Sequence, residues 1–260
     1  MHPESEPLVR QTRDARGVVT LTLNRPQAFN ALSEGMLAQL QCQLDALAPD
    51  ETLRVLVIAG AGKAFCAGHD LREMRVAPSE DYYRRLFAQC GRMMLTLRAL
   101  PVPVIARVHG LATAAGCQLV AQCDLAVASS EARFAVSGVN LGLFCSTPAV
   151  PLSRSVLAKQ AFEMLVTGEF VDARQAERRG LVNRVVEPEA LDGEIEKLLA
   201  SILVKPRVAI ALGKELFYRQ AELPLTQAYQ AAEATMALNM MDDAALERVQ
   251  AFIEKRPARN

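Results

Sequence analysis

The sequence predicts an α/β fold in which strands and helices alternate along most of the chain. A continuous apolar run at residues 55–59 is typical of a strand buried on both faces, and residues 34–47 and 81–100 have apolar positions at helical spacing. Such alternation is what βαβ units require. With 260 residues, 51% of them apolar, the chain has enough material for one large hydrophobic core.

The remaining elements of the first 190 residues follow from turn and cap signals. The turn at residues 14–17 predicts a hairpin between the first two strands, and Ser33 is predicted to cap the helix that follows it. Thr113 is the expected N-cap of a buried helix that runs through residue 120. The further predicted strands cover residues 8–11, 18–24, 102–108, 124–128 and 133–136.

After residue 190 the pattern changes to helices only. They are predicted at residues 192–204, 206–220, 225–240 and 242–254. We therefore divide the chain into a core at residues 1–190 and a helical C-terminal region at residues 191–260. Met236, Leu238, Met240 and Met241 form an apolar surface there, which predicts burial against the main body or another subunit.

Composition argues against several classes of function. Lys plus Arg and Asp plus Glu number 29 each, so no overall positive field exists to hold nucleic acid or an anionic membrane. No apolar run is long enough to span a bilayer. Six scattered cysteines and three histidines show no metal-binding spacing, and neither a metal nor a separate cofactor is expected. The cysteine pattern and the N-terminal MHPESEPLVR, which lacks a signal peptide, predict a cytoplasmic location.

Two segments follow buried strands and are rich in small residues. They are "FCAGHDL" at residues 65–71 and "HGLATAAGCQL" at residues 109–119. Small residues let a ligand approach the main chain, and free N–H groups at a helix start favour a developing negative charge. Two such donors that face one cavity would form an oxyanion hole.

Taken together with "LNRPQAFNALS", "PVPVIARVHGLATAAGCQLVAQCDLAVAS" and "EMLVTGEFVDARQAERRGLVNRVV", these segments resemble the crotonase (enoyl-CoA hydratase/isomerase) superfamily along nearly the whole chain. "SGVNLGLFCSTP" and "GLATAAGCQL" most resemble its enoyl-CoA hydratase domain-containing protein 3 subgroup. The resemblance implies a crotonase-like spiral of ββα units with a helical C-terminal trimerisation region. It also implies a homotrimer or a hexamer built as a dimer of trimers.

The resemblance implies an acyl-CoA thioester as the ligand, with coenzyme A as part of the substrate. The oxyanion donors would be the backbone N–H groups of His69 and Ala115. Gln118 stands where hydratases carry their first acid/base glutamate. Residues implied in substrate or CoA binding are Arg25, Ala28, Lys63, Ala67, Gly68, Asp70, Leu71, Gly116, Gly138 and Cys145.

The chain departs from the hydratase pattern at both acid/base positions. Gln118 cannot accept a proton from water, and Gly138, at the second glutamate position, has no side chain. Three interpretations therefore remain open: an enoyl-CoA hydratase-like lyase with altered catalysis, a different thioester reaction such as hydrolysis, decarboxylation or isomerisation, and a non-catalytic acyl-CoA-binding protein. Asp70 is interpreted as a cap or a proton-transfer group, and Cys145 as a buried structural thiol or a nucleophile.

Overall fold

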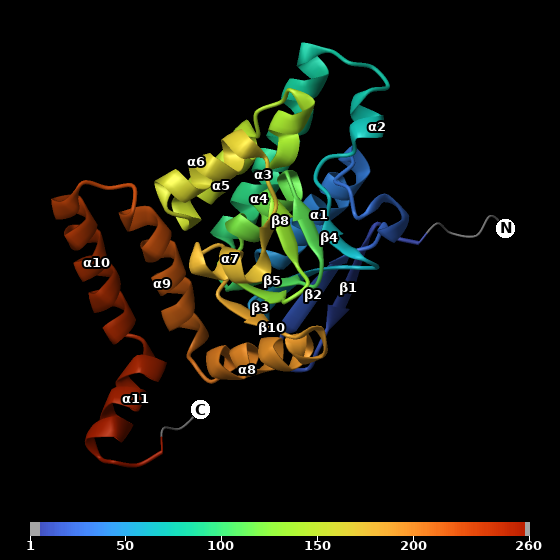
Figure 1. Cartoon of the computed structure of the whole chain (residues 1–260). Coiled ribbons are helices and arrows are strands. Elements are labelled where there is room, and N and C mark those ends of the chain that lie inside the picture. Colours follow the sequence, from blue (N-terminus) through green and yellow to red (C-terminus); the bar gives the residue numbers. More distant parts are fainter. Residues whose placement is uncertain (1–5, 258–260) are drawn as a thin grey trace.

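Two β-sheets lie at the centre of the computed structural model, which describes residues 6–257 (Figure 1). Residues 1–5, part of the N-terminal segment considered above for a signal peptide, lie outside the described residues. The larger sheet has the order β1 (Val9–Arg13), β2 (Val18–Leu23), β3 (Val55–Gly60), β5 (Val104–Val108), β7 (Leu125–Ser129) and β10 (Arg184–Val186). The smaller sheet has the order β4 (Ala64–Cys66), β6 (Leu111–Thr113), β8 (Arg133–Ala135) and β9 (Val171–Asp172).

The chain winds as a spiral of ββα units, as predicted. Strands β3, β5 and β7 pair in parallel in the larger sheet, and each is followed by a strand of the smaller sheet, β4, β6 or β8. A helical segment then leads back to the next strand of the larger sheet. The hairpin of β1 and β2, with Val9 opposite Leu23, precedes the first full unit and confirms the predicted turn.

Helices surround the two sheets. In the first part of the chain they are α1 (Glu34–Leu47), α2 (Leu71–Met74), α3 (Glu80–Ala99), α4 (Ala115–Gln122), α5 (Ser146–Ser155), α6 (Ala158–Thr167) and α7 (Ala173–Arg178). Short 3-10 helices are η1 (Pro26–Ala28), η2 (Ser137–Leu141) and η3 (Pro188–Ala190). The last four helices are α8 (Leu191–Leu203), α9 (Arg207–Gln220), α10 (Leu225–Met240) and α11 (Asp243–Ile253). As predicted, Ser33 caps α1, because its Oγ accepts the N–H of Met36 at 3.2 Å.

The larger sheet is covered on both faces, which explains the continuous apolar run of β3. Leu56 and Ile58 belong to the main core, whereas Val55 and Val57 pack in a second cluster on the opposite face. That second face is closed by α8, through apolar side chains that include Leu198. Alternate residues of a strand point to opposite faces, so a strand buried on both sides must be apolar throughout.

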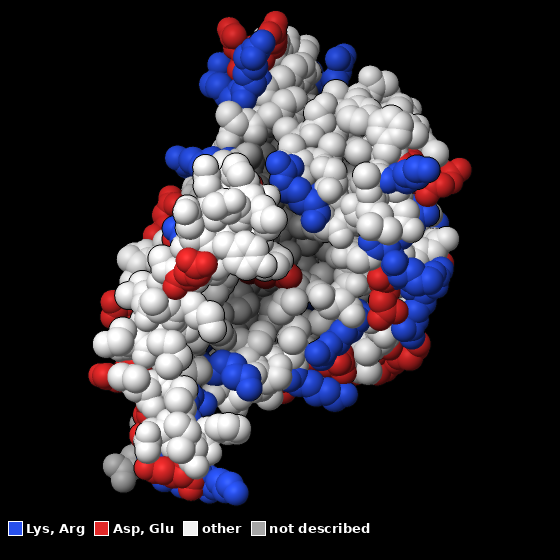
Figure 2. Space-filling view, turned by 90° about the vertical axis from the view of Figure 1, so that its left-hand side faces the viewer, with Lys and Arg blue, Asp and Glu red and all other residues white. Residues whose placement is uncertain are grey.

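The helices α9 to α11 stand beside the main body (Figure 1). Met236, Leu238 and Met241 are more than 60% exposed, so this part of the predicted apolar surface does not pack on the main body. Figure 2 looks onto this side of the molecule, where basic and acidic residues are interspersed and the area between them is largely uncharged. The proposed boundary between residues 190 and 191 stays a prediction. Among residues 6–257, no helix has the length and apolar character needed to cross a bilayer.

A buried asparagine joins the loop before α1 to the connection between β3 and β4. Asn30 is fully buried and left-handed, with φ of 55°, a conformation that asparagine tolerates well. Its Oδ1 accepts the N–H of Arg25 at 2.9 Å, and its Nδ2 donates to the carbonyls of Ala61 and Ala64 at 2.8 Å. The β3–β4 connection leads directly into the segment at residues 67–70, so this side chain positions the segment.

Replacement of this amide is expected to be costly. Asn30→Ala leaves one buried donor and several buried acceptors without partners, and each unsatisfied buried group costs about 1–3 kcal/mol. We expect the free energy of unfolding to fall by about 3 kcal/mol or more, which urea denaturation measures. Gln27→Ala, at an exposed position of η1, is the matched control with an expected change under about 0.5 kcal/mol. If Asn30→Ala lowers the free energy of unfolding no more than Gln27→Ala does, the stabilising role of the Asn30 side chain is contradicted.

Candidate functional site

The segment after β4 directs one backbone N–H away from its neighbours. Leu32 pairs with it in parallel: the Leu32 N–H donates to the Gly68 carbonyl at 2.8 Å, and the Asp70 N–H donates to the Leu32 carbonyl at 3.3 Å. In a parallel pairing, the residue between these two partners points its own N–H to the opposite side. The N–H of His69 therefore faces away from Leu32.

The start of α4 supplies a second N–H without an intrahelical acceptor. Ala115 is the first residue of α4, where helix geometry leaves the N–H groups unpaired. The preceding residue is Ala114, whose φ of 48° and ψ of −117° turn the chain sharply into the helix. Thr113, predicted as the N-cap, does not cap α4: its hydroxyl donates to the Ala67 carbonyl at 3.0 Å and ties the two segments together. The predicted N-cap was wrong because a backbone turn opens this helix.

Glycines allow these two segments to touch. A Cβ on Gly68, where φ is +95°, would lie 2.9 Å from the Ala114 Cβ and 3.2 Å from the Ala115 nitrogen. A Cβ on Gly116 would lie 2.0 Å from the Cys66 carbonyl oxygen. Neither position accepts a larger residue without a shift of the backbone, so both glycines keep the two N–H groups close together.

A cavity of about 300 Å³ lies against these two segments. Most of its walls are apolar side chains from α2, α3 and the chain between β8 and α5. Of the predicted site residues, Ala67, His69, Leu71, Ala115, Gly138 and Cys145 line it. The other lining residues are Met74, Phe87, Ala114, Ser137, Leu141, Leu143, Phe144, Ser146, Thr147 and Pro148. A concave, mostly apolar space next to unpaired N–H groups has the character of a small-molecule site.

Asp70 has the capping role that was one of its two interpretations. Its Oδ1 accepts the N–H groups of Arg72 and Glu73 at 3.0 and 3.2 Å, and its Oδ2 accepts from Arg25 Nη1 at 2.5 Å. Burial by itself would raise the pKa of Asp70, but Arg25 and these backbone donors lower it below the usual value. A carboxylate held in this way is a poor proton donor at neutral pH.

Three of the predicted CoA-binding residues that do not line the cavity occupy two neighbouring loops. Arg25 precedes η1 with its guanidinium on Asp70, Ala28 ends η1, and Lys63 is exposed between β3 and β4. Since Arg25 already has a carboxylate partner, Lys63 is the more available cation for a phosphate. Contact with coenzyme A stays a prediction for all three residues.

The imidazole of His69 forms part of the cavity wall with its carbon atoms. Its ring meets Phe87 edge to face, with centroids 5.5 Å apart, and both ring nitrogens are covered without a hydrogen-bond partner among residues 6–257. Burial lowers the pKa of His69, and the opposing effect of the Leu32 backbone is smaller. The ring is thus neutral near pH 7, with its basic nitrogens withheld from the cavity.

Gln118 and Gly138, which are predicted to stand at the two glutamate positions of hydratases, differ in their surroundings. Gln118 is 4% exposed on the face of α4 that also carries Ala115, and its Oε1 has no hydrogen-bond partner among residues 6–257. At Gly138, a Cβ would lie 2.5 Å from the Leu143 carbonyl oxygen and 2.7 Å from the Cys145 sulfur. The second position is therefore closed to any side chain, which the sequence alone does not reveal.

Cys145 has the character of a structural thiol. Its Sγ accepts the N–H of Gly138 at 3.3 Å, and burial raises its pKa. A thiol that stays protonated is a weak nucleophile. Its neighbour across the cavity, His69, has no accessible nitrogen to act as the base, so these contacts do not favour nucleophilic catalysis.

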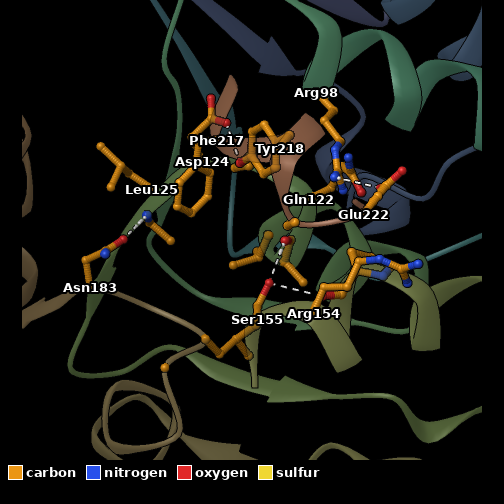
Figure 3. A pocket seen from close by; sticks show the side chains of 18 residues that line it. Arg98, Gln122, Asp124, Leu125, Arg154, Ser155, Asn183, Phe217, Tyr218 and Glu222 are labelled. Atoms are coloured by element: carbon orange, nitrogen blue, oxygen red, sulfur yellow. Dashed lines mark hydrogen bonds and ion pairs between the residues drawn. The ribbon is translucent and has the colours of Figure 1, made fainter. Parts of the chain in front are cut away.

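A second hollow, of about 450 Å³, lies between α9 and the main body (Figure 3). Its polar side chains bind one another: Tyr218 donates to Asp124 at 2.6 Å, Arg98 to Glu222 at 3.1 Å, and Ser155 to two backbone carbonyls. Sequence reasoning did not single out this hollow. Because these groups are already paired, the hollow offers a ligand fewer free donors than the cavity beside His69. No group of three potential metal ligands occurs in the described part of the chain.

The fold agrees with the comparisons with known proteins. The family model "Enoyl-CoA hydratase/isomerase" matches residues 13–259, and the chain belongs to this family. The structure of the enoyl-CoA hydratase of Mycobacterium smegmatis has a TM-score of 0.97 at 65% identity, covering 98% of this chain and 99% of that one. Human enoyl-CoA hydratase domain-containing protein 3 gives a TM-score of 0.93 at 41% identity, covering 97% and 100%. The Rattus norvegicus protein of the same name is 45% identical over 98% of this chain and 85% of its own. These relatives support the predicted subgroup.

The predicted cytoplasmic location is contradicted. The relatives from Rattus norvegicus, Mus musculus, Xenopus laevis and Homo sapiens are all named as mitochondrial proteins. The prediction depended partly on cysteine use, and all six cysteines are indeed unpaired. Unpaired thiols, however, indicate only reducing surroundings and do not distinguish one reducing compartment from another.

Acid is expected to destabilise the fold through two partly buried histidines. Burial lowers the pKa of His69 and of His109 below 6.5, so the unfolded chain binds more protons than the folded chain once the pH falls through about 6.5. The free energy of unfolding therefore decreases from pH 7.5 to 5.5, as urea denaturation at each pH measures. His69→Leu keeps the backbone and removes one titrating group, so its decrease should be smaller. If the free energy of unfolding of His69→Leu falls between pH 7.5 and 5.5 by as much as that of the original protein, His69 is not one of the groups responsible.

A side chain at position 138 is expected to disrupt the loop before α5. Gly138→Ala places a Cβ against a carbonyl oxygen and a sulfur, which should lower the free energy of unfolding by about 1–3 kcal/mol. Gly138→Glu should cost more. Gly193→Ala, within α8 where a Cβ meets nothing within 4 Å, is the control and should be neutral or slightly stabilising. Thermal denaturation compares the three variants, and a Gly138→Glu protein as stable as the original would show that the position is open.

Proposed function

We propose that this protein binds acyl-CoA thioesters and stabilises the enolate form of the thioester in a backbone oxyanion hole. The single observation that carries the proposal is the pair of N–H groups at His69 and Ala115, brought together by Gly68 beside one mostly apolar cavity. The thioester oxygen would accept both hydrogen bonds. As negative charge develops on this oxygen, each donor would contribute roughly 3 kcal/mol.

Backbone donors suit this task because the fold holds them in place before the ligand arrives. The N–H of His69 is directed by the pairing with Leu32, and the N–H of Ala115 by the start of α4. Neither depends on a side chain that must reorganise. This explains how alanine at 114 and 115 is compatible with an oxyanion hole.

The same geometry supports only weak enoyl-CoA hydratase activity. Hydration needs groups that take a proton from water and deliver one to the substrate carbon. Gln118 supplies an amide, and Gly138 has no room for a carboxylate. We therefore place this protein among acyl-CoA-binding members of the family with an altered lyase site, and another thioester reaction or a binding role remains the alternative.

The assembly we propose is a homotrimer or a dimer of trimers. Its support is the apolar surface that α10 and α11 leave uncovered in the single chain, where Leu225, Met236, Met241 and Phe252 are each more than 70% exposed. Contiguous apolar surface on protruding helices is typical of subunit contacts. The proposal includes no cofactor apart from the coenzyme A of the substrate.

Acetoacetyl-CoA tests the oxyanion hole without requiring a catalytic base, because this β-keto thioester ionises readily at its central carbon. The site should favour the enolate, and the increase in ultraviolet absorbance on titration with protein measures its formation. Ala115→Pro removes one donor at the first residue of α4, so we expect enolate binding about 10²-fold weaker.

Ala158→Pro is the matched control, since Ala158 is also the first residue of its helix and does not line the cavity. It should bind the enolate as the original protein does. Circular dichroism establishes that both variants are folded. Equal enolate binding by the two variants would contradict the role of the Ala115 N–H.

A further inference from the structure

The cavity at the oxyanion donors continues into a second cavity. This second space, of about 380 Å³, is lined by Leu71, Met74, Arg75, Tyr83, Phe87, Leu141 and Leu143. Five of these residues also line the first cavity: Leu71, Met74, Phe87, Leu141 and Leu143. The two spaces therefore meet at a boundary of apolar side chains between α2 and α3 on one side and the chain after β8 on the other.

The combined space has little that could pair with a charged or strongly polar ligand group. All five shared side chains are apolar, and Leu71, Leu141 and Leu143 are each about half exposed or more. The charged side chain in the lining of the two cavities is Arg75, at the far end from His69. Half-exposed leucines around a cavity lower the free energy when an apolar ligand covers them.

Phe87 stands at the junction of the two spaces. Its ring meets His69, which lines the first cavity, edge to face at 5.5 Å. On its other side it stacks on Tyr83, which lines the second cavity, with centroids 6.3 Å apart. Tyr83 and Phe87 thus lie one helical turn apart on α3, along the route from the proposed oxyanion donors to the second cavity.

We propose that an unbranched acyl chain runs from the oxyanion donors past Phe87 into the second cavity, and that Phe87 and Leu143 determine how long a chain is accepted. This inference rests on the proposed function, because the thioester oxygen must be anchored at His69 and Ala115. Each methylene that enters the apolar space should strengthen binding by about fourfold.

Binding of butyryl-, hexanoyl-, octanoyl- and decanoyl-CoA, measured by isothermal titration calorimetry on the full chain, tests the inference. We expect octanoyl-CoA to bind about 10²-fold more tightly than butyryl-CoA, with little further gain once the chain extends beyond the second cavity. A bulkier ring in Phe87→Trp should reduce this ratio below about tenfold.

Leu143→Asn is the second variant, because it places a polar group at the boundary from a half-exposed position that tolerates substitution. It should reduce the ratio in the same way. Leu95→Ala is the matched control. Leu95 lies on α3, as Phe87 does, but it is 66% exposed and lines neither cavity, so this variant should keep the original ratio.

The outcomes separate the two proposals. If none of the four thioesters binds, butyryl-CoA included, the proposed function itself is overturned. If butyryl-CoA binds but longer chains bind no more tightly, the acyl route alone is overturned. The same conclusion follows if the folded Phe87→Trp and Leu143→Asn proteins keep the gain in affinity for longer chains. A gain lost in these two variants and kept in Leu95→Ala would support it.

Discussion

The buried amide of Asn30 is the contact on which the geometry of the site depends. It connects the loop before α1 to the β3–β4 connection through hydrogen bonds to Arg25, Ala61 and Ala64. The chain that leaves this connection forms β4 and then the segment paired with Leu32. One side chain thus holds together two loops that approach the cavity from different parts of the sequence.

The chemistry that results belongs to the backbone more than to side chains. Asp70 serves α2 and Arg25, the nitrogens of His69 are covered, and the Cys145 thiol is kept protonated by burial. In the proposed site, the groups that act on the ligand are the N–H groups of His69 and Ala115, whose orientation follows from a strand pairing and a helix start. Such a site can keep its affinity for a developing oxyanion while the acid/base residues change.

Two hollows beside α9, of about 730 and 450 Å³, are larger than the cavity beside His69, so size alone does not identify a site. The hollow of about 730 Å³ beside α9 includes in its lining the buried Lys214, which donates to Asp124 at 2.7 Å and to two backbone carbonyls close by. Together with Tyr218, this pair fastens α9 to the main body, and breaking a buried pair of this kind is costly. The smaller cavity has unpaired donors instead, and it opens into the apolar space around Phe87.

Most of the fold was predictable from the sequence, and the residues proposed for the oxyanion hole were also named from it. Periodicity and turn signals depend on neighbours in the chain, so the strands β2 and β3, the helix α1 with its Ser33 cap, and the cap role of Asp70 followed from local pattern. The spiral, and the identity of residues 69 and 115, came from the resemblance to a family. That resemblance was specific because several motifs occur in order.

Tertiary structure decided what depends on residues distant in the chain. The hydroxyl of Thr113 binds the Ala67 carbonyl instead of capping α4, and the guanidinium of Arg25 is held by Asp70, 45 positions away. Position 138 is closed by Leu143 and Cys145, and the second cavity exists only where α3 meets the chain after β8. By itself the sequence determined which groups are available to the site. Packing between distant segments decided which of these groups are free, because a donor or a space is available only if no other part of the fold has occupied it.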